Sequence, residues 1–328
     1  MDVSIVIPLY NESESLIELN EWINESLISS GFSYEIIYID DGSDDQSWNI
    51  IEDIAKENNN VKGISLSRNF GKSQALRVGF YESKGDYVAT LDADLQDSPE
   101  EIPIMIDKLI KNNLDMISGW KKKRHDSYFF KKIPSLFFNL VARTFSGIKL
   151  HDFNCGIKVY KKEVIKSINL YADMHRFIPI LAKNEGFDKI EEHIVKHQPR
   201  KYGKSKFGNE RFIRGFLDIT TLWFTNKFGR RPMHFFGLIG TIMSFVGTIF
   251  SIYLGYNKLF VDTNSRLITT RPEFYIALAT MILGAQFFIA GFIAELILKF
   301  NLNKDRYCLL YTSPSPRDNS GSRMPSSA

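Results

Sequence analysis

The sequence predicts an α/β domain with a mostly parallel sheet, followed by two helices that cross a membrane. Up to about residue 120, short apolar runs alternate with amphipathic stretches whose apolar residues recur every three or four positions. Such alternation is typical of a parallel sheet with helices on both faces. Farther along, residues 234–256 and 274–294 contain no Asp, Glu, Lys or Arg, and each stretch is long enough to span a bilayer.

The alternating part contains five expected strands separated by four expected helices. In the first helix, the apolar residues at positions 16, 19, 23 and 27 share one face, and Ser13 can cap the amino end. The runs expected as strands are 3–7, 35–39, 61–66, 87–91 and 115–118. The stretches expected as helices are 13–29, 46–56, 73–83 and 99–111. In an open sheet of this class, ligands bind at the carboxyl ends of the strands.

Residues 127–146 and 207–232 are expected to form two amphipathic helices of a different kind. Each has a stripe of aromatic and aliphatic side chains on one face, with basic side chains elsewhere, such as Arg143 and Arg211. Ordinary core packing is the alternative explanation for such a stripe. Because basic residues accompany it and two apolar spans follow, we expect both helices to lie in the bilayer interface.

Residues 233–300 are expected to form a pair of transmembrane helices. Helices of this length also occur in the cores of large soluble proteins, but the lack of charge favours the membrane. Basic residues precede the first span and follow the second, and the connection 257–272 also contains three, so the asymmetry is modest. The positive-inside rule then places both ends of the chain in the cytoplasm and 257–272 outside. We therefore expect a multi-pass protein of the cell inner membrane.

The two ends of the sequence complete this organisation. The chain enters a strand directly, without the basic and apolar regions typical of a secretory signal, and residues 1–206 are expected to form one domain. Residues 301–328 end in a Ser- and Pro-rich stretch without periodicity, which we expect to be disordered. This tail also resembles a translated sequencing adapter, and we assign it no function.

Composition argues against several classes of protein. Cys155 and Cys308 are the only cysteines and lie far apart, which is unlike a disulfide framework or a structural zinc site and fits a reducing cytoplasm. The formal net charge is only +3, yet basic clusters occur at 121–124, 131–132 and 200–206. Such runs are often plain solvated surface. Because these adjoin aromatic amphipathic segments, we expect them to face anionic lipid or phosphate groups, and we expect no nucleic-acid partner.

The most informative segment is Asp92-Ala-Asp94-Leu-Gln96-Asp97, which follows the expected strand 87–91. Two carboxylates one residue apart at the mouth of a buried strand suit a hard cation, Mg²⁺ or Mn²⁺, that also holds phosphate oxygens. Alone, such a pair is more often a solvated turn. Three companion segments strengthen the interpretation because they also end or follow strands, and they can converge on the same crevice: 3–12, 34–44 and 66–72.

In order and spacing, these four segments resemble the glycosyltransferase family 2 enzymes, particularly the polyprenyl-phosphate sugar transferases. Dolichyl-phosphate mannose synthases and bacterial undecaprenyl-phosphate glucosyltransferases are examples of this type. The resemblance covers about the first 230 residues and extends into the membrane segment. It implies that residues 1–206 form a catalytic domain with the GT-A nucleotide-sugar-binding fold.

The resemblance implies a donor side of the site. The residues that would contact the nucleotide are Pro8, Tyr10, Glu12, Asp40, Asp41, Asp92, Ala93 and Lys121. Asp41 would hydrogen-bond the base and Asp40 would orient the loop, although a plain turn is the alternative for this pair. The implied metal ligands are Asp92, Asp94 and Gln96, with Asp94 as the main ligand of Mg²⁺ or Mn²⁺. Related enzymes commonly have Arg at the position of Lys121, so its role stays open.

The resemblance also implies an acceptor side. Arg200 and Lys206 match a family loop that closes on phosphate groups, and Arg176 would face the acceptor phosphate. The segment 151–158 resembles the one before the family's last sheet strand and makes Asp152 and Lys158 acceptor-side candidates. His175 alone is more often a structural histidine. The catalytic set implied in this way is Asp94, Asp152, Arg176, Arg200 and Lys206.

The expected activity is the inverting, metal-dependent transfer of one sugar from a nucleotide sugar to polyprenyl phosphate, most simply undecaprenyl phosphate. The sequence lacks the Gln-x-x-Arg-Trp motif of processive polysaccharide synthases, which favours single-sugar transfer. UDP is favoured weakly over GDP, and the donor sugar is left open. Two alternatives remain: transfer to another lipid such as diacylglycerol, and a non-catalytic nucleotide-binding membrane scaffold. Gly237, Gly240 and Gly247 permit close helix packing and hence a homo-oligomer.

Overall fold

The structure of the chain is a computed structural model. It describes residues 1–122, 133–171, 173–202, 220–221, 223–224, 227–229, 231–261 and 267–301, with only the backbone described for 133–138, 300 and 301. Lys206, residues 207–219 of the expected interfacial helix and the tail 302–328 lie outside these ranges. Residues up to 220 and residues 221–307 fall into two compact units, each of which is described by itself.

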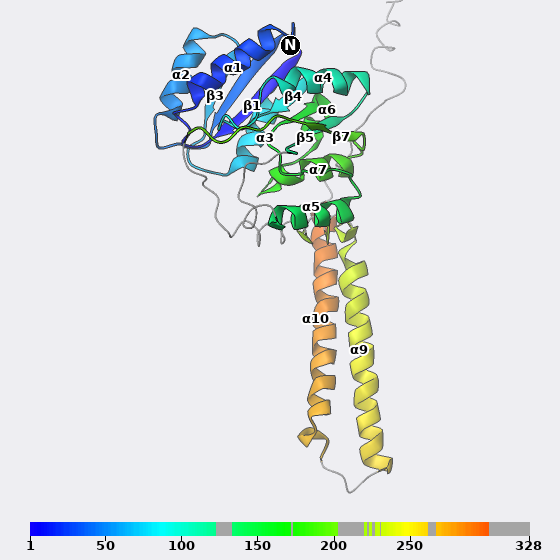
Figure 1. The fold of residues 1–328 in the computed structure, drawn as a ribbon. Coiled ribbons are helices and arrows are strands. Elements are labelled where there is room, and N and C mark those ends of the chain that lie inside the picture. The colour runs from blue at the N-terminus through cyan, green and yellow to red at the C-terminus, as the bar shows by residue number, and fades with distance from the viewer. Residues whose placement is uncertain are drawn as a thin grey trace, which may run out of the picture. The chain divides into compact units, whose positions relative to one another are not determined.

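Within the described residues, the first unit contains a seven-stranded sheet in the order β3-β2-β1-β4-β6-β5-β7 (Figure 1). The strands are β1 Val3–Leu9, β2 Tyr34–Asp40, β3 Val61–Ser65, β4 Tyr87–Thr90, β5 Met116–Trp120, β6 Lys158–Lys161 and β7 Ile190–Ile194. β1 pairs in parallel with β2 and β4, as do β2 with β3 and β5 with β7. Only β6 runs antiparallel to its neighbours, β4 and β5. The predicted mostly parallel sheet is confirmed.

Helices cover both faces of this sheet. The α-helices of this unit are α1 Leu16–Ile28, α2 Ser47–Glu57, α3 Lys72–Glu82, α4 Glu101–Lys111, α5 Ile133–Ser146, α6 Lys162–Ser167 and α7 Ile178–Asn184, and the 3₁₀ helix is η2 Met174–Phe177. All residues of β1 and β2 are buried, which fits interior parallel strands. Because side chains alternate along a strand, Ile5 packs into the core beneath α1 and α4, whereas Val6 packs into the core beneath α3.

Two strands of the sheet differ from the pattern-based prediction. β6 spans only four residues and has lysine at both ends, so it shows little apolar alternation. β7 lies at the edge of the sheet and contains Glu191, Glu192 and His193. Charged side chains protect an exposed strand edge from pairing with other chains, and they also hide the strand from a hydrophobicity pattern. The expectation that the sheet ends with the strand after residues 151–158 is therefore wrong, because β7 follows β6.

The second unit contains two long apolar helices that lie side by side, α9 Pro232–Tyr256 and α10 Pro272–Asn301 (Figure 1). Two short elements, η3 Asn257–Val261 and η4 Ile268–Thr270, lie between them. The segments Pro232–Val261 and Pro272–Lys299 are long and apolar enough to cross a membrane, with mean hydropathies of 1.9 and 2.1. The two apolar helices predicted from the sequence are present as candidate spans.

Glycine allows α9 and α10 to approach each other backbone to backbone. A Cβ atom on Gly240 would lie 2.6 Å from the carbonyl oxygen of Gly284, and one on Gly284 would lie 2.6 Å from the amide nitrogen of Ser244. Glu295 of α10 also contacts the start of α9, because its Oε2 accepts a hydrogen bond from the Met233 N–H at 3.4 Å. A carboxylate at the amino end of a helix is favourable for the helix dipole.

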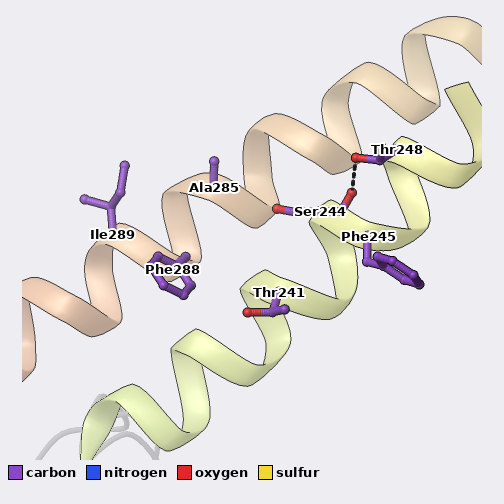
Figure 2. A pocket seen from close by; sticks show the side chains of 7 residues that line it. All are labelled: Thr241, Ser244, Phe245, Thr248, Ala285, Phe288 and Ile289. Carbon is purple, nitrogen blue, oxygen red and sulfur yellow. Dashed lines mark hydrogen bonds between the residues drawn. The ribbon is translucent and has the colours of Figure 1, made fainter. Parts of the chain in front are cut away.

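An open groove of about 490 Å³ runs between these two helices, as Figure 2 shows. Its lining residues are Thr241, Ser244, Phe245, Thr248, Ala285, Phe288 and Ile289. The Thr248 Oγ1 donates a hydrogen bond to the Ser244 carbonyl at 2.7 Å, drawn as a dashed line in Figure 2. Internal hydrogen bonding of this kind lets a hydroxyl group face an apolar surrounding without a water partner.

Candidate active site

The candidate site lies at the carboxyl ends of β1, β2, β4 and β5, where the chain leaves the sheet. The segment Tyr10–Glu12 follows β1, Asp41 follows β2, Asp92–Gln96 follows β4 and Lys121 follows β5. β6 is antiparallel, so the segment that precedes it reaches the same edge of the sheet. The sequence motifs therefore converge, as ligand sites of open α/β sheets do.

Asp92 pairs with a lysine for which the sequence alone predicts no role. The Lys72 Nζ, in the first turn of α3, donates to the Asp92 Oδ1. Burial disfavours the charged carboxylate, but Lys72 and two further lysines outweigh burial and hold the pKa of Asp92 far below its usual range. A Cβ atom on Gly156 would lie 2.5 Å from the Asp92 Oδ2, so only glycine leaves room for this carboxylate.

Asp94 shares an arginine with Glu12. One guanidinium nitrogen of Arg200 lies 3.0 Å from the Asp94 Oδ2 and 3.2 Å from the Glu12 Oε1. Burial and the neighbouring Asp92 charge raise the pKa of Asp94, and Arg200 opposes this rise. The structure thus brings together three predicted site residues from segments that lie up to 188 positions apart in the sequence.

Gln96 lies beside Asp94. Its backbone N–H donates to the Asp94 Oδ1 at 3.2 Å. With its side-chain nitrogen turned toward Asp94, the amide donates to Oδ2 at 2.9 Å, and its oxygen accepts from the Arg200 backbone N–H at 3.3 Å. Leu95, between the two, has a φ of 58°, an uncommon conformation for a residue with a side chain. This turn presents both polar side chains on the same side of the loop.

The loop after β2 is fixed by its own carboxylates. Asp40 accepts hydrogen bonds from the Ser43 N–H at 3.1 Å and from the Ser65 hydroxyl at 3.3 Å. Asp41 accepts from the N–H groups of Phe70 and Gly71, at 2.8 and 2.9 Å. Burial raises the pKa of Asp41, and these two N–H groups counteract the rise. Both residues therefore shape the loop, and the role of Asp41 toward a base stays a prediction.

The remaining nucleotide-side candidates lie around the loop after β1. Pro8 is buried within β1, where it pairs in register with Ile39. The Glu12 N–H donates to the Ser47 hydroxyl at 3.0 Å, which ties this loop to the start of α2. The Ala93 carbonyl accepts a hydrogen bond from the Ser15 hydroxyl at 2.6 Å. Tyr10 is partly buried in the same loop.

Lys121 has a buried carboxylate as its partner. Its Nζ lies 2.6 Å from the Asp97 Oδ1, and the His197 Nδ1 lies 3.4 Å from the same oxygen. Burial alone would raise the pKa of Asp97, but the charge of Lys121 and the contact with His197 lower it. Asp97 belongs to the segment 92–97 and His197 lies three residues before Arg200, yet the sequence alone predicts a role for neither.

Three of the acceptor-side candidates, Asp152, Lys158 and Arg176, are buried. Asp152 is buried and its Oδ1 accepts a hydrogen bond from the Asn154 N–H at 3.0 Å. Lys158 is also buried and donates to the Cys155 carbonyl, and burial lowers its pKa. Arg176 is buried in η2. The neighbouring His175 lies 3.1 Å from the Ser73 hydroxyl, consistent with a structural histidine.

The Asp94 carboxylate is the type of ligand that suits a hard cation bound together with its substrate. Among the described residues, no three His, Cys, Asp or Glu side chains are grouped as metal ligands. Mg²⁺ in phosphate sites, however, is commonly held by one or two carboxylates plus substrate phosphates. Asp94 is a carboxylate of the required kind, and its two oxygens accept hydrogen bonds from the Gln96 N–H and from Arg200. The Gln96 side-chain oxygen accepts from the Arg200 backbone N–H, so the role of Gln96 as a metal ligand stays a prediction. Asp92 faces Lys72 instead, so its role as a metal ligand stays a prediction.

Similar solved structures are distant in sequence. A crystal structure described as a mycobacterial protein is 18% identical, covers 69% of this chain and 74% of that chain, and has a TM-score of 0.51, which supports the fold. Glucosyl-3-phosphoglycerate synthase from Mycobacterium tuberculosis, solved with Mn²⁺, UDP and glucosyl-3-phosphoglycerate, is 19% identical. The match covers 69% of this chain and 79% of the synthase chain, with a TM-score of 0.48.

Closer relatives and a family pattern identify the chain. The pattern described as Glycosyl transferase family 2 matches residues 4–168. A dodecaprenyl-phosphate galacturonate synthase of Rhizobium johnstonii is 34% identical over 91% of this chain and 88% of the relative. An undecaprenyl-phosphate 4-deoxy-4-formamido-L-arabinose transferase of Shewanella sediminis is 35% identical over 90% of this chain and 86% of the relative. With relatives that match nearly along its whole length, the chain belongs to glycosyltransferase family 2 and is a sugar-transferring enzyme.

Proposed function

We propose that this enzyme transfers a single sugar from a nucleotide sugar to polyprenyl phosphate at the cytoplasmic face of the inner membrane. The observation that carries the proposal is the extent of the match to relatives named for transfer to dodecaprenyl or undecaprenyl phosphate, at 90% or more of this chain. The two candidate spans support it, because the acceptor lipid resides in a bilayer. Helices 127–146 and 207–232 are proposed to rest on the membrane surface.

On the donor side, the loops after β1 and β2 are proposed to hold the nucleotide through Tyr10, Glu12 and Asp41. UDP is the favoured nucleotide, and the sugar is left for experiment. Mg²⁺ or Mn²⁺ on Asp94 and Gln96 would supply charge neutralisation of the diphosphate as it leaves. The chain's own contribution is a rigid loop around these ligands, held by the Gln96 N–H bond to Asp94 and by the Ser15 bond to the Ala93 carbonyl.

On the acceptor side, no general base is required. A phosphate monoester has its second pKa at about 6, so at neutral pH its oxygen is mostly deprotonated before it attacks. That oxygen forms a bond to the anomeric carbon while the bond to the diphosphate oxygen breaks and the nucleoside diphosphate keeps the electron pair. One direct displacement inverts the anomeric configuration. Arg176, Arg200 and Lys206 are proposed to hold the attacking phosphate in line.

The test uses the purified full chain in detergent with labelled UDP- and GDP-sugars and Mn²⁺. Undecaprenyl phosphate, diacylglycerol and no lipid are compared as acceptors. The expected product is an inverted, acid-labile polyprenyl-phosphate sugar formed only with undecaprenyl phosphate. Transfer to diacylglycerol would replace the acceptor in this proposal. Nucleotide binding with no sugar release under any condition would instead support a non-catalytic scaffold.

A further inference from the structure

A buried cluster of ionisable side chains adjoins the candidate metal loop. It consists of Asp97, Lys121 and His197, whose side chains are 0%, 13% and 6% exposed. Asp97 follows Gln96, Lys121 follows β5, and His197 precedes Arg200 by three residues. The Asp97 carboxylate is the shared partner, at 2.6 Å from Lys121 and 3.4 Å from His197. One carboxylate thus joins three segments that each contribute to the site.

The backbone reinforces this junction. Asp97 and His197 form an isolated antiparallel bridge, and the Gln198 N–H donates to the Gln96 carbonyl at 2.9 Å. Two residues beyond Gln198, Arg200 reaches Asp94 and Glu12. The position of the Arg200 guanidinium therefore depends on the short pairing between residues 96–97 and 197–198.

Stability alone does not account for a buried ion pair of this kind. Removing two charges from water is costly, and well-packed apolar side chains often stabilise a fold as well or better. What such a pair does supply is a fixed position for each charge. The Lys121 ammonium is close enough to Asp92 to contribute to the depressed pKa of that carboxyl, so it also acts on the mouth of the site.

We propose that Asp97 is a positioning residue, which fixes the Lys121 ammonium on the diphosphate side of the site and holds the segment that carries Arg200 beside Asp94. This proposal rests on the function proposed above, because it concerns the charge that develops on a leaving nucleoside diphosphate. Asp97 does not touch the reacting atoms and acts through the two cations. Fixed cations stabilise a developing negative charge without having to reorganise during the reaction.

A double-mutant cycle tests whether Asp97 acts through Lys121. The variants are Asp97→Asn, Lys121→Gln and the double variant, each assayed for kcat, for KM of the donor and for thermal stability. Each single change should lower kcat by about tenfold to a hundredfold, the scale expected when a reacting group is misplaced. The kcat of the double variant should fall no further than that of the worse single variant. Its melting temperature should be at least as high as that of either single variant, because it leaves no unpaired charge buried.

Two controls separate positioning from folding. Lys121→Arg keeps a cation beside Asp97 and should retain most of kcat. Asp107→Asn makes the same chemical change on an exposed position of α4 and should leave both kcat and melting temperature within error. The proposal would be overturned if the two losses of kcat multiplied in the double variant. It would also be overturned if Asp97→Asn lowered the melting temperature and left kcat unchanged. If Asp97→Asn does not fold, comparison of Lys121→Gln, Lys121→Arg and the double variant still decides it.

A measurement of nucleotide binding tests the role of Asp97 independently of the acceptor that the enzyme uses. Titration calorimetry with Mn²⁺ and whichever of UDP or GDP the unmodified chain binds needs no acceptor. Asp97→Asn and Lys121→Gln should each raise the dissociation constant of the nucleotide by about tenfold, as expected for one misplaced charged contact. Unchanged affinity in both variants would contradict the positioning role. If the unmodified chain uses another acceptor, the proposed function fails while the same cycle can be run with that acceptor.

Discussion

Asp94 is the side chain through which the predicted metal site can be tested most directly. Asp94→Ala should lower sugar transfer by at least about a hundredfold, the scale seen when a key electrostatic stabiliser is removed. The fold should persist, because Arg200 keeps Glu12 as a partner at 3.2 Å. Initial rates and circular dichroism measure the two effects. Treatment with EDTA should have the same consequence, and Mg²⁺ or Mn²⁺ should restore activity.

A matched control for this substitution is available on α2. Asp53 is an exposed carboxylate paired with Lys56, and Asp53→Ala should leave transfer unchanged because exposed ion pairs contribute little. Equal losses in both variants would point to a general effect of charge. Full activity of the unmodified chain in EDTA would rule out the metal.

Arg200 and Asp152 should differ sharply in their effect on activity. Arg200→Ala removes a cation proposed to hold phosphate, and we expect a loss of about a hundredfold or more. Asp152→Asn keeps an oxygen that can accept the Asn154 N–H bond, and the acceptor phosphate needs no base, so measurable activity should remain. Rates with undecaprenyl phosphate at saturating donor distinguish the two. A dead Asp152→Asn variant beside an active Arg200→Ala variant would reverse the assigned roles.

At this scale, the sequence predicts site residues where they belong to compact motifs. Asp92, Asp94 and Glu12 are predicted because they stand in family-like motifs that follow apolar strands, and Arg200 because its basic loop resembles one of the family. The structure brings Arg200 to Asp94 and Glu12. Lys72, Asp97 and His197 were given no role, because their partners come from other segments of the chain. No spacing rule links Asp97 to residues 24 and 100 positions away. Such pairings are set by the tertiary fold.

At the scale of elements, the glycine contact between α9 and α10 gives a clear expectation. Gly240→Ala should destabilise the purified protein by about 1–3 kcal/mol, the range for overpacking, since its Cβ would meet the Gly284 carbonyl at 2.6 Å. Gly255→Ala in the same helix meets nothing within 4 Å and should be neutral or slightly stabilising. Thermal unfolding in detergent compares them. Equal melting temperatures would show that the helices do not pack closely at Gly240.

Element prediction succeeded where apolar periodicity was strong. The helix predicted at 99–111 is α4 Glu101–Lys111, and the run 87–91 contains β4. It failed for β7, whose Ile-Glu-Glu-His-Ile sequence has no apolar alternation because an edge strand has one side open to solvent. Its pairing with β5, about 75 positions earlier, supplies the stability that local propensity does not.

For the whole molecule, the orientation in the membrane is the decisive expectation. Both ends should lie in the cytoplasm, where the nucleotide sugar is, with 257–272 on the opposite side. In a variant without Cys155 and Cys308, a cysteine placed at Thr263 should react with an impermeant reagent added to intact cells. A cysteine placed at Ser205 should react only after lysis; both positions lie outside the described residues. The reverse labelling would separate the site from its donor.

The strand order also bears on how the chain folds during its synthesis. β3, β2, β1 and β4 are neighbours and come from the first 90 residues, so this half of the sheet can assemble early. β5 must wait, because both of its neighbours, β6 and β7, are made later. Arg200 is made 106 positions after its partner Asp94. A nascent chain can therefore form the loops after β1 and β2 well before it can close the candidate site, and closure coincides with emergence of the segment that precedes the first candidate span.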